Sequence, residues 1–288
     1  MSETVLRKIE APVETPSGKG ARDENFPVGS WLIQKKLRPH VAAFYAFARA
    51  IDDIADNPEL RSGIKISRLN GFADALCGNN EDPSYAKAHV LRTKLNEVRV
   101  TTQYGLDLIS AFKQDAIKSR YTNWSELIDY CNRSAAPVGR FLLDLHGERA
   151  SLYKLSDDLC NALQIINHLQ DCAIDYANLN RVYLPEEWMQ TQSSNVVDLA
   201  QTKATPALRA VIDRCLDGTD KLLAQARKLP VEMEHKRLAM ETAVIVAIAE
   251  RLSKKLRHCD PLSGSVVLKW PGFALASISG LLRLWFRA

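Results

Sequence analysis

Residues 164–175 read QIINHLQDCAID, and residues 181–185, shortly after them, read RVYLP. At 100° per residue, Gln164, Asn167, Asp171 and Asp175 fall within a sector about 80° wide, and apolar residues fill most of the remainder. A stripe of this kind is not the broad, mixed-charge face of an ordinary surface helix. Because buried carboxylates without partners are costly, this predicted helix requires something cationic to meet it.

A second polar stripe lies on a predicted helix at residues 37–56. Pro39 suits the first turn, and Asn57 followed by a proline suits the end. This helix is apolar on nearly every side, which predicts a core position. One side is nevertheless polar within about 60°, at i, i+4, i+7 and i+11. Its members are Tyr45, Arg49, Asp52 and Asp56.

Helical periodicity continues through most of the chain. We expect helices at residues 64–76, 85–104, 106–119, 124–145, 206–229 and 232–257, with Pro137 and Gly139 interrupting the fourth where it lines a cavity. Asp157 and Asp158 are expected to start the helix of the opening stripe. Residues 186–205 are expected to form a polar loop. No alternating strand pattern occurs, so the prediction is an all-α fold in one domain, residues 24–288, after a disordered tail at 1–23.

Composition excludes several classes of protein. The net charge of +4 is mild and evenly spread, so no nucleic-acid partner is expected. The six cysteines show neither a CxxC pair nor a zinc spacing, which suits reduced thiols in the cytoplasm. The first 23 residues lack the apolar core of a signal peptide, and no run of about 18 apolar residues could span a bilayer. The sequence therefore predicts a cytoplasmic protein, soluble or peripheral on the inner face of the cytoplasmic membrane.

The two acidic stripes together favour metal chemistry. A single pair of aspartates one turn apart is as readily a solvated helix face, but two pairs on two core helices change that balance. Carboxylates at this spacing bind Mg²⁺, which commonly bridges to substrate phosphates, and guanidinium groups such as Arg49 and Arg181 suit phosphate oxygens. A buried ion-pair network between the helices is the alternative, although the aspartates, Asp53 included, outnumber those arginines.

The last stretch, residues 271–288, has an amphipathic pattern. Leu275, Ile278, Leu282 and Trp285 fall on one side, and Arg283 falls mostly on the other. It has two interpretations, which stay open at this point. It is either the last helix of the bundle, covering the core, or a surface that contacts an anionic membrane and receives a lipid substrate.

Several of these segments resemble the squalene/phytoene synthase family over residues 24–285. They are NFPVGS at 25–30, YAFARAIDDIAD at 45–56, and residues 164–175 with RVYLP at 181–185. RPHVAA at 38–43, FKQD at 112–115, DYC at 129–131 and PVG at 137–139 are most similar to the hydroxysqualene synthase branch of bacterial hopanoid pathways. Gln170 stands where phytoene and dehydrosqualene synthases typically have arginine. Ala136 departs from the asparagine expected before PVG.

This resemblance implies an isoprenoid-synthase-type helical bundle around a central cavity. It implies Mg²⁺-dependent conversion of presqualene diphosphate to hydroxysqualene, with ionisation, carbocation rearrangement and a water quench. The implied catalytic residues are Asp52, Asp56, Asp171, Asp175, Tyr45 and Tyr183, and the four aspartates are also the implied metal ligands. The implied substrate-binding and cation-stabilising residues are Phe26, Tyr45, Arg49, Asp53, Tyr130, Gln164, Asn167, Arg181 and Tyr183. No GxGxxG fingerprint is present, so NADPH is not expected.

Some roles and functions stay open on the sequence alone. Each aromatic residue has core packing as an alternative role, and Gln164 and Asn167 could orient the diphosphate, a metal-bound water or the quenching water. Asp115, Arg120 and Tyr121 belong either to the site or to an exposed helix end, and His168 is interpreted as a packing residue rather than a base. Two other functions remain: condensation of two farnesyl diphosphates to presqualene diphosphate, squalene or a carotenoid precursor, and a non-catalytic scaffold.

Overall fold

A computed structural model describes residues 13–14 and 33–286 of the chain. The predicted tail at 1–23 falls almost entirely outside the described residues, and so does Phe26. In the described part the regular structure is helical without strands, and Tyr121 and Pro185 form an isolated parallel bridge. The α-helices are α1 Arg38–Asp56, α2 Ser62–Cys77, α3 Ala86–Val98, α4 Gln103–Asp115, α5 Trp124–Ser134, α6 Ala136–His146, α7 Tyr153–Gln170, α8 Cys172–Leu179, α9 Glu186–Thr191, α10 Pro206–Ala226, α11 Leu229–Glu232, α12 Lys236–His258 and α13 Trp270–Trp285. The all-α prediction is confirmed.

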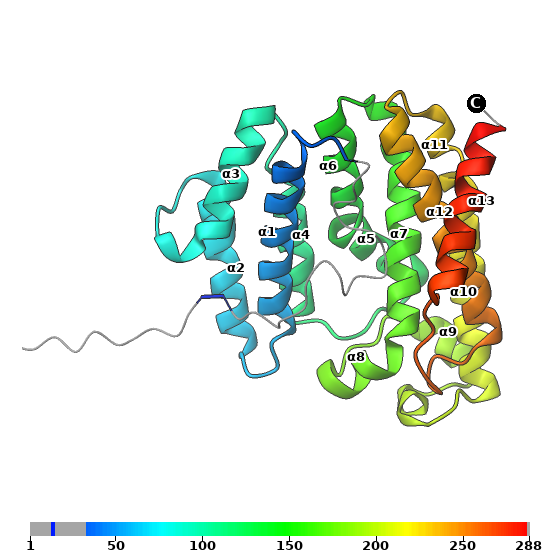
Figure 1. The fold of residues 1–288 in the computed structure, drawn as a ribbon. Coiled ribbons are helices and arrows are strands. Elements are labelled where there is room, and N and C mark those ends of the chain that lie inside the picture. Colours follow the sequence, from blue (N-terminus) through cyan, green and yellow to red (C-terminus); the bar gives the residue numbers. More distant parts are fainter. Residues whose placement is uncertain (1–12, 15–32, 287–288) are drawn as a thin grey trace, which may run out of the picture.

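The helices form one bundle in which α1 and α7 flank the centre (Figure 1). Helices α1 to α4 lie on one side, α10, α12 and α13 lie on the other, and α5 and α6 lie between them. Buried apolar residues form two clusters that follow this division, one built mainly on α1 to α4 and the other on α5 to α13. The predicted core helix 37–56 is α1, with Pro39 in its first turn and Asn57 as the extended residue after its end.

The predicted helix at residues 164–175 is bent. Helix α7 ends at Gln170, Asp171 adopts φ −104° and ψ 6°, and α8 begins at Cys172. The backbone ladder persists across the bend, because Asp171 N donates to Asn167 O and Asp175 N donates to Asp171 O. Gln170 is held from outside the helix by a 2.6 Å bond to the carbonyl of Val266. The straight stripe predicted from 100° geometry therefore applies to α7 alone, and Asp175 lies beyond the bend.

The predicted interruption near Pro137 is present. Helix α5 ends at Ser134, Ala135 adopts a non-helical conformation, and α6 begins at Ala136 with the proline in its first turn. Gly139 is then required by close packing, since a Cβ there would lie 2.3 Å from Ser156 Oγ and 2.6 Å from Cys160 Sγ on α7. Helices α6 and α7 approach each other closely at this glycine.

Other predicted boundaries were wrong. The helix expected at 85–104 ends at Val98, because Arg99 adopts a left-handed conformation with φ 56°. The loop expected after Pro185 contains α9 and a short 3-10 helix at Val196–Ala200. Helix α7 begins at Tyr153 rather than at the two aspartates, which are buried and paired, Asp157 with Arg140 and Asp158 with a lysine one turn away. Their carboxylates are therefore paired with side-chain cations and do not cap the N-terminus of the helix.

Candidate active site

An apolar cavity of about 240 Å³ lies between α1, α6, α7, α11 and α12. Most of the described residues that line it are aliphatic or aromatic, and they are Ile33, Val41, Phe44, Tyr45, Ala48, Val138, Gly139, Phe141, Leu142, Leu143, Ser156, Leu159, Cys160, Leu163, Leu229, Met233, Leu238, Glu241, Thr242 and Ile245. Tyr45 contributes the predicted aromatic face from α1. The cavity has the chemistry of a hydrocarbon-binding site.

Helices α1 and α7 change character at the end of this cavity. On α1 the cavity-lining residues end at Ala48, and Arg49, Asp52 and Asp56 follow within two turns. On α7 they end at Leu163, and the polar stripe follows from Gln164. The two helices run in the same direction (Figure 1), so the same end of each is polar. An apolar volume is thus continued along both helices by carboxylates, amides and arginines.

Arg181 joins the α1 carboxylates to the rest of the site. It is 6% exposed, and its Nη1 donates to Asp56 Oδ1 at 2.8 Å. Its Nη2 donates to the backbone carbonyl of Asp115 at 3.2 Å, and its Nε lies 3.7 Å from the carboxylate of the same residue. Nη1 also donates to Tyr183 Oη at 3.2 Å. The guanidinium therefore has partners on α1, on α4 and within its own segment.

Residues 181–186, the segment that carries Arg181, are fixed by backbone hydrogen bonds. Val182 N donates to Ser119 O at 2.9 Å, and Glu186 N donates to Tyr121 O at 2.9 Å. Asn180, just before the segment, adopts a left-handed conformation that ends α8. Arg120 binds Asn180 through its side-chain oxygen and its carbonyl. Arg120 therefore supports the loop that presents Arg181 and is not itself among the cavity-lining residues.

Three buried tyrosines pack beside Arg181. Tyr121 and Tyr183 stack with ring centroids 5.3 Å apart, and Tyr130 lies tilted against both at 5.3 and 5.6 Å. Tyr130 Oη donates to Asp115 Oδ2 at 2.6 Å. Tyr130 and Tyr183, both predicted site residues, therefore belong to one cluster with Arg181. Tyr121 is fully buried in the same cluster, so of its two open interpretations the exposed helix end is excluded.

Asp115 is the residue that sequence reasoning placed least well. It is buried at the end of α4, and burial raises its pKa to about 7 against the lowering effects of Arg181 and Tyr130. A usable signal was present, because Leu108, Ala111 and Asp115 share the buried face of α4 at helical spacing. A carboxylate on an apolar face predicts a buried partner, which here is Arg181.

His168 is buried, and its ring stacks on Tyr183 with centroids 3.4 Å apart and an interplanar angle of 13°. Burial, and to a lesser extent Arg181, lowers its pKa to about 3, so the ring is neutral at physiological pH. Its Nε2 lies 3.2 Å from the Nε2 of Gln164. The ring accordingly packs and hydrogen-bonds, as expected, and a protonated His168 plays no part at neutral pH.

The α1 carboxylates form a crowded group. Arg49 lies 3.2 Å from Asp52 and 2.9 Å from the buried Asp53. Burial, and next the neighbouring Asp56, raises the pKa of Asp52 well above its usual value despite Arg49. Like charges one turn apart repel each other, and a further cation would relieve that repulsion. These ion pairs lie within α1, so they do not test the predicted alternative of an ion-pair network between the two helices.

The α7 and α8 side of the site is more open. Asp171 is exposed at the bend, and Asn167 and Asp175 are half-buried. Asp175 O accepts from Arg181 N at 3.2 Å, so the backbone joins this side to the arginine segment. Gln170 is buried, and its amide nitrogen donates to the carbonyl of Val266.

The donor set fits Mg²⁺ bound together with phosphate. Among the described residues, no three His, Cys, Asp or Glu side chains gather into a ready-made metal cage. Mg²⁺ is usually held by one or two carboxylates with waters and substrate phosphates, and the described residues supply Asp52 and Asp56 on α1, Asp171 at the bend and Asp175 on α8. The residues therefore suit an ion that arrives with a diphosphate.

The chain matches the family model described as squalene/phytoene synthase over residues 20–273. It is 44% identical over 272 residues to a hydroxysqualene synthase of Rhodopseudomonas palustris, covering 93% of this chain and 91% of that protein. It is 43% identical to a hydroxysqualene synthase of Zymomonas mobilis, covering 87% and 84%. A phytoene synthase of Mycobacterium tuberculosis is 28% identical, with 67% and 66% covered.

Solved structures agree on the fold. A squalene synthase from Alicyclobacillus acidocaldarius superposes with a TM-score of 0.70 at 30% identity, covering 80% of this chain and 87% of that one. A dehydrosqualene synthase in complex with a ligand superposes with a TM-score of 0.72 at 21% identity, covering 87% and 88%. At that identity the second match supports the fold alone.

Proposed function

The chain belongs to the squalene/phytoene synthase family, and from that premise we propose that it converts presqualene diphosphate to hydroxysqualene in hopanoid biosynthesis. The feature that carries this proposal is the apolar cavity that passes, along α1 and α7, into carboxylates and arginines. A hydrocarbon chain suits the first part and a diphosphate suits the second. Relatives named hydroxysqualene synthase at 39–44% identity support this branch.

In this proposal the polar residues bind the diphosphate. Ion pairs with Asp115 and Asp56 orient Arg181, and ion pairs with Asp52 and Asp53 orient Arg49. Both guanidinium groups are therefore held in place before the substrate binds. Mg²⁺ held by Asp52, Asp56, Asp171 and Asp175 would neutralise the diphosphate and make it a better leaving group. Asn167 lies on α7 one turn before Asp171.

The aromatic residues divide between the two parts of the site. Tyr45 lines the apolar cavity, where its ring face can stabilise a carbocation without trapping it. Tyr130 and Tyr183 are buried in the cluster beside Arg181, and Tyr130 donates to Asp115. The contacts of these two tyrosines are explained by core packing and by their hydrogen bonds with Asp115 and Arg181. In this proposal they also line the edge of the site next to Arg181.

Supplying presqualene diphosphate and Mg²⁺ without NADPH to the full-length protein tests the proposal. Hydroxysqualene and diphosphate are expected in equal amounts, and ¹⁸O from labelled water is expected in the alcohol. Consumption of farnesyl diphosphate with no hydroxysqualene from presqualene diphosphate would instead support the condensation reaction. A folded Asp171→Asn variant with full biological activity would support the scaffold role.

We also propose that α13 contacts an anionic membrane surface. Ala276 and Gly280 are buried, and a Cβ at Gly280 would lie 2.4 Å from the carbonyl oxygen of Ala243, so α13 packs tightly on α12 as a bundle helix. Its other side is apolar and exposed. Leu275, Ile278 and Leu282 are more than half exposed, and Trp285 is 82% exposed. Both interpretations of this segment are therefore compatible, because they concern opposite faces of the helix.

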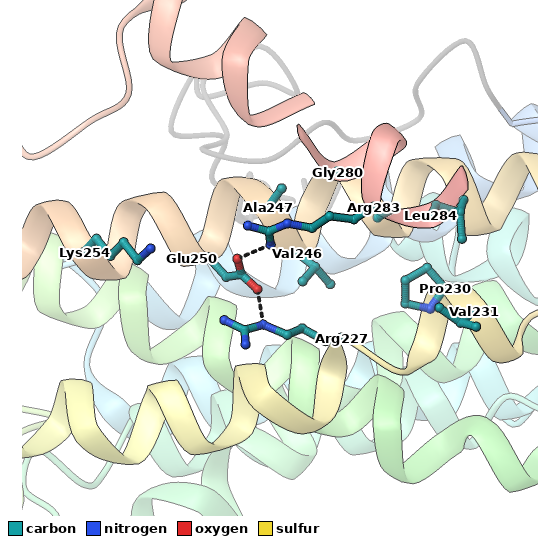
Figure 2. Close-up of a pocket in the computed structure, with 11 residues that line it drawn as sticks. Arg227, Pro230, Val231, Val246, Ala247, Glu250, Lys254, Gly280, Arg283 and Leu284 are labelled. Atoms are coloured by element: carbon teal, nitrogen blue, oxygen red, sulfur yellow. Dashed lines mark hydrogen bonds and ion pairs between the residues drawn. The ribbon is translucent and has the colours of Figure 1, made fainter. Parts of the chain in front are cut away.

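Charge favours a membrane as the occupant of that face. Arg283 and Arg227 both bind the buried carboxylate of Glu250, at 2.7 and 2.5 Å, and Lys254 lines the same pocket (Figure 2). Arg251 lines a groove with the exposed leucines of α13. The apolar stripe is thus bordered by more cations than anions, the arrangement of an interfacial helix. Among the described helices, none has the length and hydropathy to cross a bilayer.

Vesicle sedimentation tests this contact. The full-length protein should sediment with phosphatidylglycerol-containing vesicles and much less with pure phosphatidylcholine. Ile278→Glu combined with Leu282→Glu should abolish sedimentation, whereas Val90→Glu, at an exposed apolar position on α3, should not. Equal sedimentation of all variants would overturn the contact. Loss of a dimer in the α13 variant, seen by light scattering without vesicles, would assign the face to a second copy instead.

A further inference from the structure

Gln164 stands where the apolar cavity gives way to the polar end of α7. It lies one turn after Cys160, which lines the cavity, and seven residues before Asp171. Cys160, Gln164 and Asp171 stand at i, i+4 and i+11, which share one side of a helix, so the amide follows the cavity wall and precedes the carboxylate at the end of α7. Gln164 is half-buried, as expected for a side chain at such a border.

The amide of Gln164 is turned by His168. Its Nε2 lies 3.2 Å from His168 Nε2. An amide nitrogen only donates, so His168 Nε2 accepts and the ring carries its proton on Nδ1. The low pKa of His168, about 3, keeps the ring neutral and able to accept. With the donating end of the amide directed to His168, the accepting oxygen Oε1 is the end left for a ligand.

His168 is itself immobilised. Its ring is 9% exposed and stacks on Tyr183 at 3.4 Å. The hydroxyl of Tyr183 accepts from Arg181, which is paired with Asp56. The orientation of Gln164 therefore derives from the same ion-paired segment that presents the arginine to the diphosphate.

We propose that His168 is a positioning residue that, through Gln164, orients the water molecule ending the reaction. This inference rests on the proposed conversion to hydroxysqualene. A phosphate oxygen offers no proton to Gln164 Oε1, but water does, so the accepting end of the amide selects water over the diphosphate. The hydrogen bond from water to Oε1 fixes the direction of the water lone pair.

The chemical step balances with the groups present. The carbon–oxygen bond to diphosphate breaks, and its electron pair leaves with the diphosphate. The oxygen of the oriented water forms a new bond to the cationic carbon, and the proton of that water passes to the released diphosphate. His168 stays neutral throughout and transfers no proton.

Product partition tests the proposal. In His168→Leu, release of diphosphate should stay within about threefold of the wild type, and both His168→Leu and Gln164→Leu are compared with the wild type by their product ratio. The ratio of hydroxysqualene to hydrocarbon elimination products should fall about tenfold. His168→Gln keeps an acceptor and should restore most of the ratio. The double leucine variant should fall no further than either single variant, because both remove the same hydrogen bond. His146→Leu, at a half-buried histidine bonded to the Leu142 carbonyl, is the control and should leave the ratio unchanged.

A second readout needs neither substrate nor metal. In ¹⁵N-histidine NMR spectra, the His168 signals should show the neutral Nδ1–H form from pH 5 to 8, and the Nε2 resonance should shift in Gln164→Leu. An unchanged product ratio in His168→Leu overturns the inference, and so does a loss of diphosphate release equal to the loss of hydroxysqualene, which would assign Gln164 to ionisation. Absence of hydroxysqualene from the wild type would instead refute the proposed function.

Discussion

The apolar cavity and the cluster around Arg181 hold their side chains by different means. In the cavity, aliphatic residues from five helices are fixed by shape, and each loses only its own contacts when changed. Around Arg181, each group has charged or hydrogen-bonded partners, so removing one group leaves the others without a partner. The difference predicts that substitutions in the cluster act strongly and together, whereas substitutions in the cavity act through volume.

The largest effect is expected from Arg181→Ala. It leaves Asp56 and the buried Asp115 without their shared cation, and breaking a buried ion pair typically costs about 3–5 kcal/mol. Urea unfolding should show that loss, and turnover should fall at least about 100-fold. Arg120→Ala, which removes hydrogen bonds to Asn180 and to the carbonyl of Ser119 but no ion pair of the cluster, is the control and should cost about 1 kcal/mol. Similar stabilities for the two variants would show that the cluster is not a unit.

Asp171→Asn should separate chemistry from stability. Asp171 is exposed at the bend, so its loss should change unfolding free energy by less than about 1 kcal/mol. Turnover should nevertheless fall about 10²–10³-fold, as when one stabilising group is removed from a charged transition state. Removing divalent ions with EDTA should abolish turnover of the wild type, and adding Mg²⁺ should restore it. Asp129→Asn, also exposed, should keep full activity.

In the cavity, Gly139→Val tests the role of volume. A Cβ there would lie 2.3 Å from Ser156 Oγ and 2.6 Å from Cys160 Sγ, so α6 and α7 must move apart. Overpacking of this kind costs about 1–3 kcal/mol, which thermal unfolding would show. Gly63→Ala has nothing within 4 Å of the new Cβ and should be neutral or slightly stabilising. A wild-type melting temperature for Gly139→Val would mean that the cavity accommodates the extra methyl groups.

The sequence predicted the two regions unequally. The all-α class and the polar stripe of α1 followed from helical periodicity, since α1 is one uninterrupted helix of 19 residues. The bend at Asp171 did not, because it coincides with a contact between Gln170 and Val266, 96 residues away. Asp115 was undecided for the same reason. Its cation, Arg181, comes from a distant segment, so the spacing on α4 predicts a buried partner but does not identify which residue it is.

The smallest effect is expected in the pH dependence of the unfolding free energy, to which Asp115 and His168 contribute with opposite signs. Asp115, with a pKa near 7 in the folded protein and about 3.9 when unfolded, makes the native state hold one proton more at pH 5. Stability from this group is present at low pH and is lost as the pH rises. His168, with a pKa of about 3 folded and about 6.5 unfolded, makes the native state hold one proton fewer. Its contribution is lost as the pH falls.

Each group alone produces a slope of about 1.4 kcal/mol per pH unit, and the slopes have opposite signs between about pH 4.5 and 6. They should therefore cancel in the wild type. Relative to it, His168→Gln should lose stability as the pH rises, and Asp115→Asn should gain it, each by about 2 kcal/mol over this interval. The double variant should run parallel to the wild type. Urea unfolding at three pH values measures these differences, and parallel curves for both single variants would mean that neither buried group keeps its shifted pKa. Both groups contact residues 181–183. Cancellation would therefore show that, on folding, the proton gained by Asp115 offsets the proton lost by His168 within one cluster.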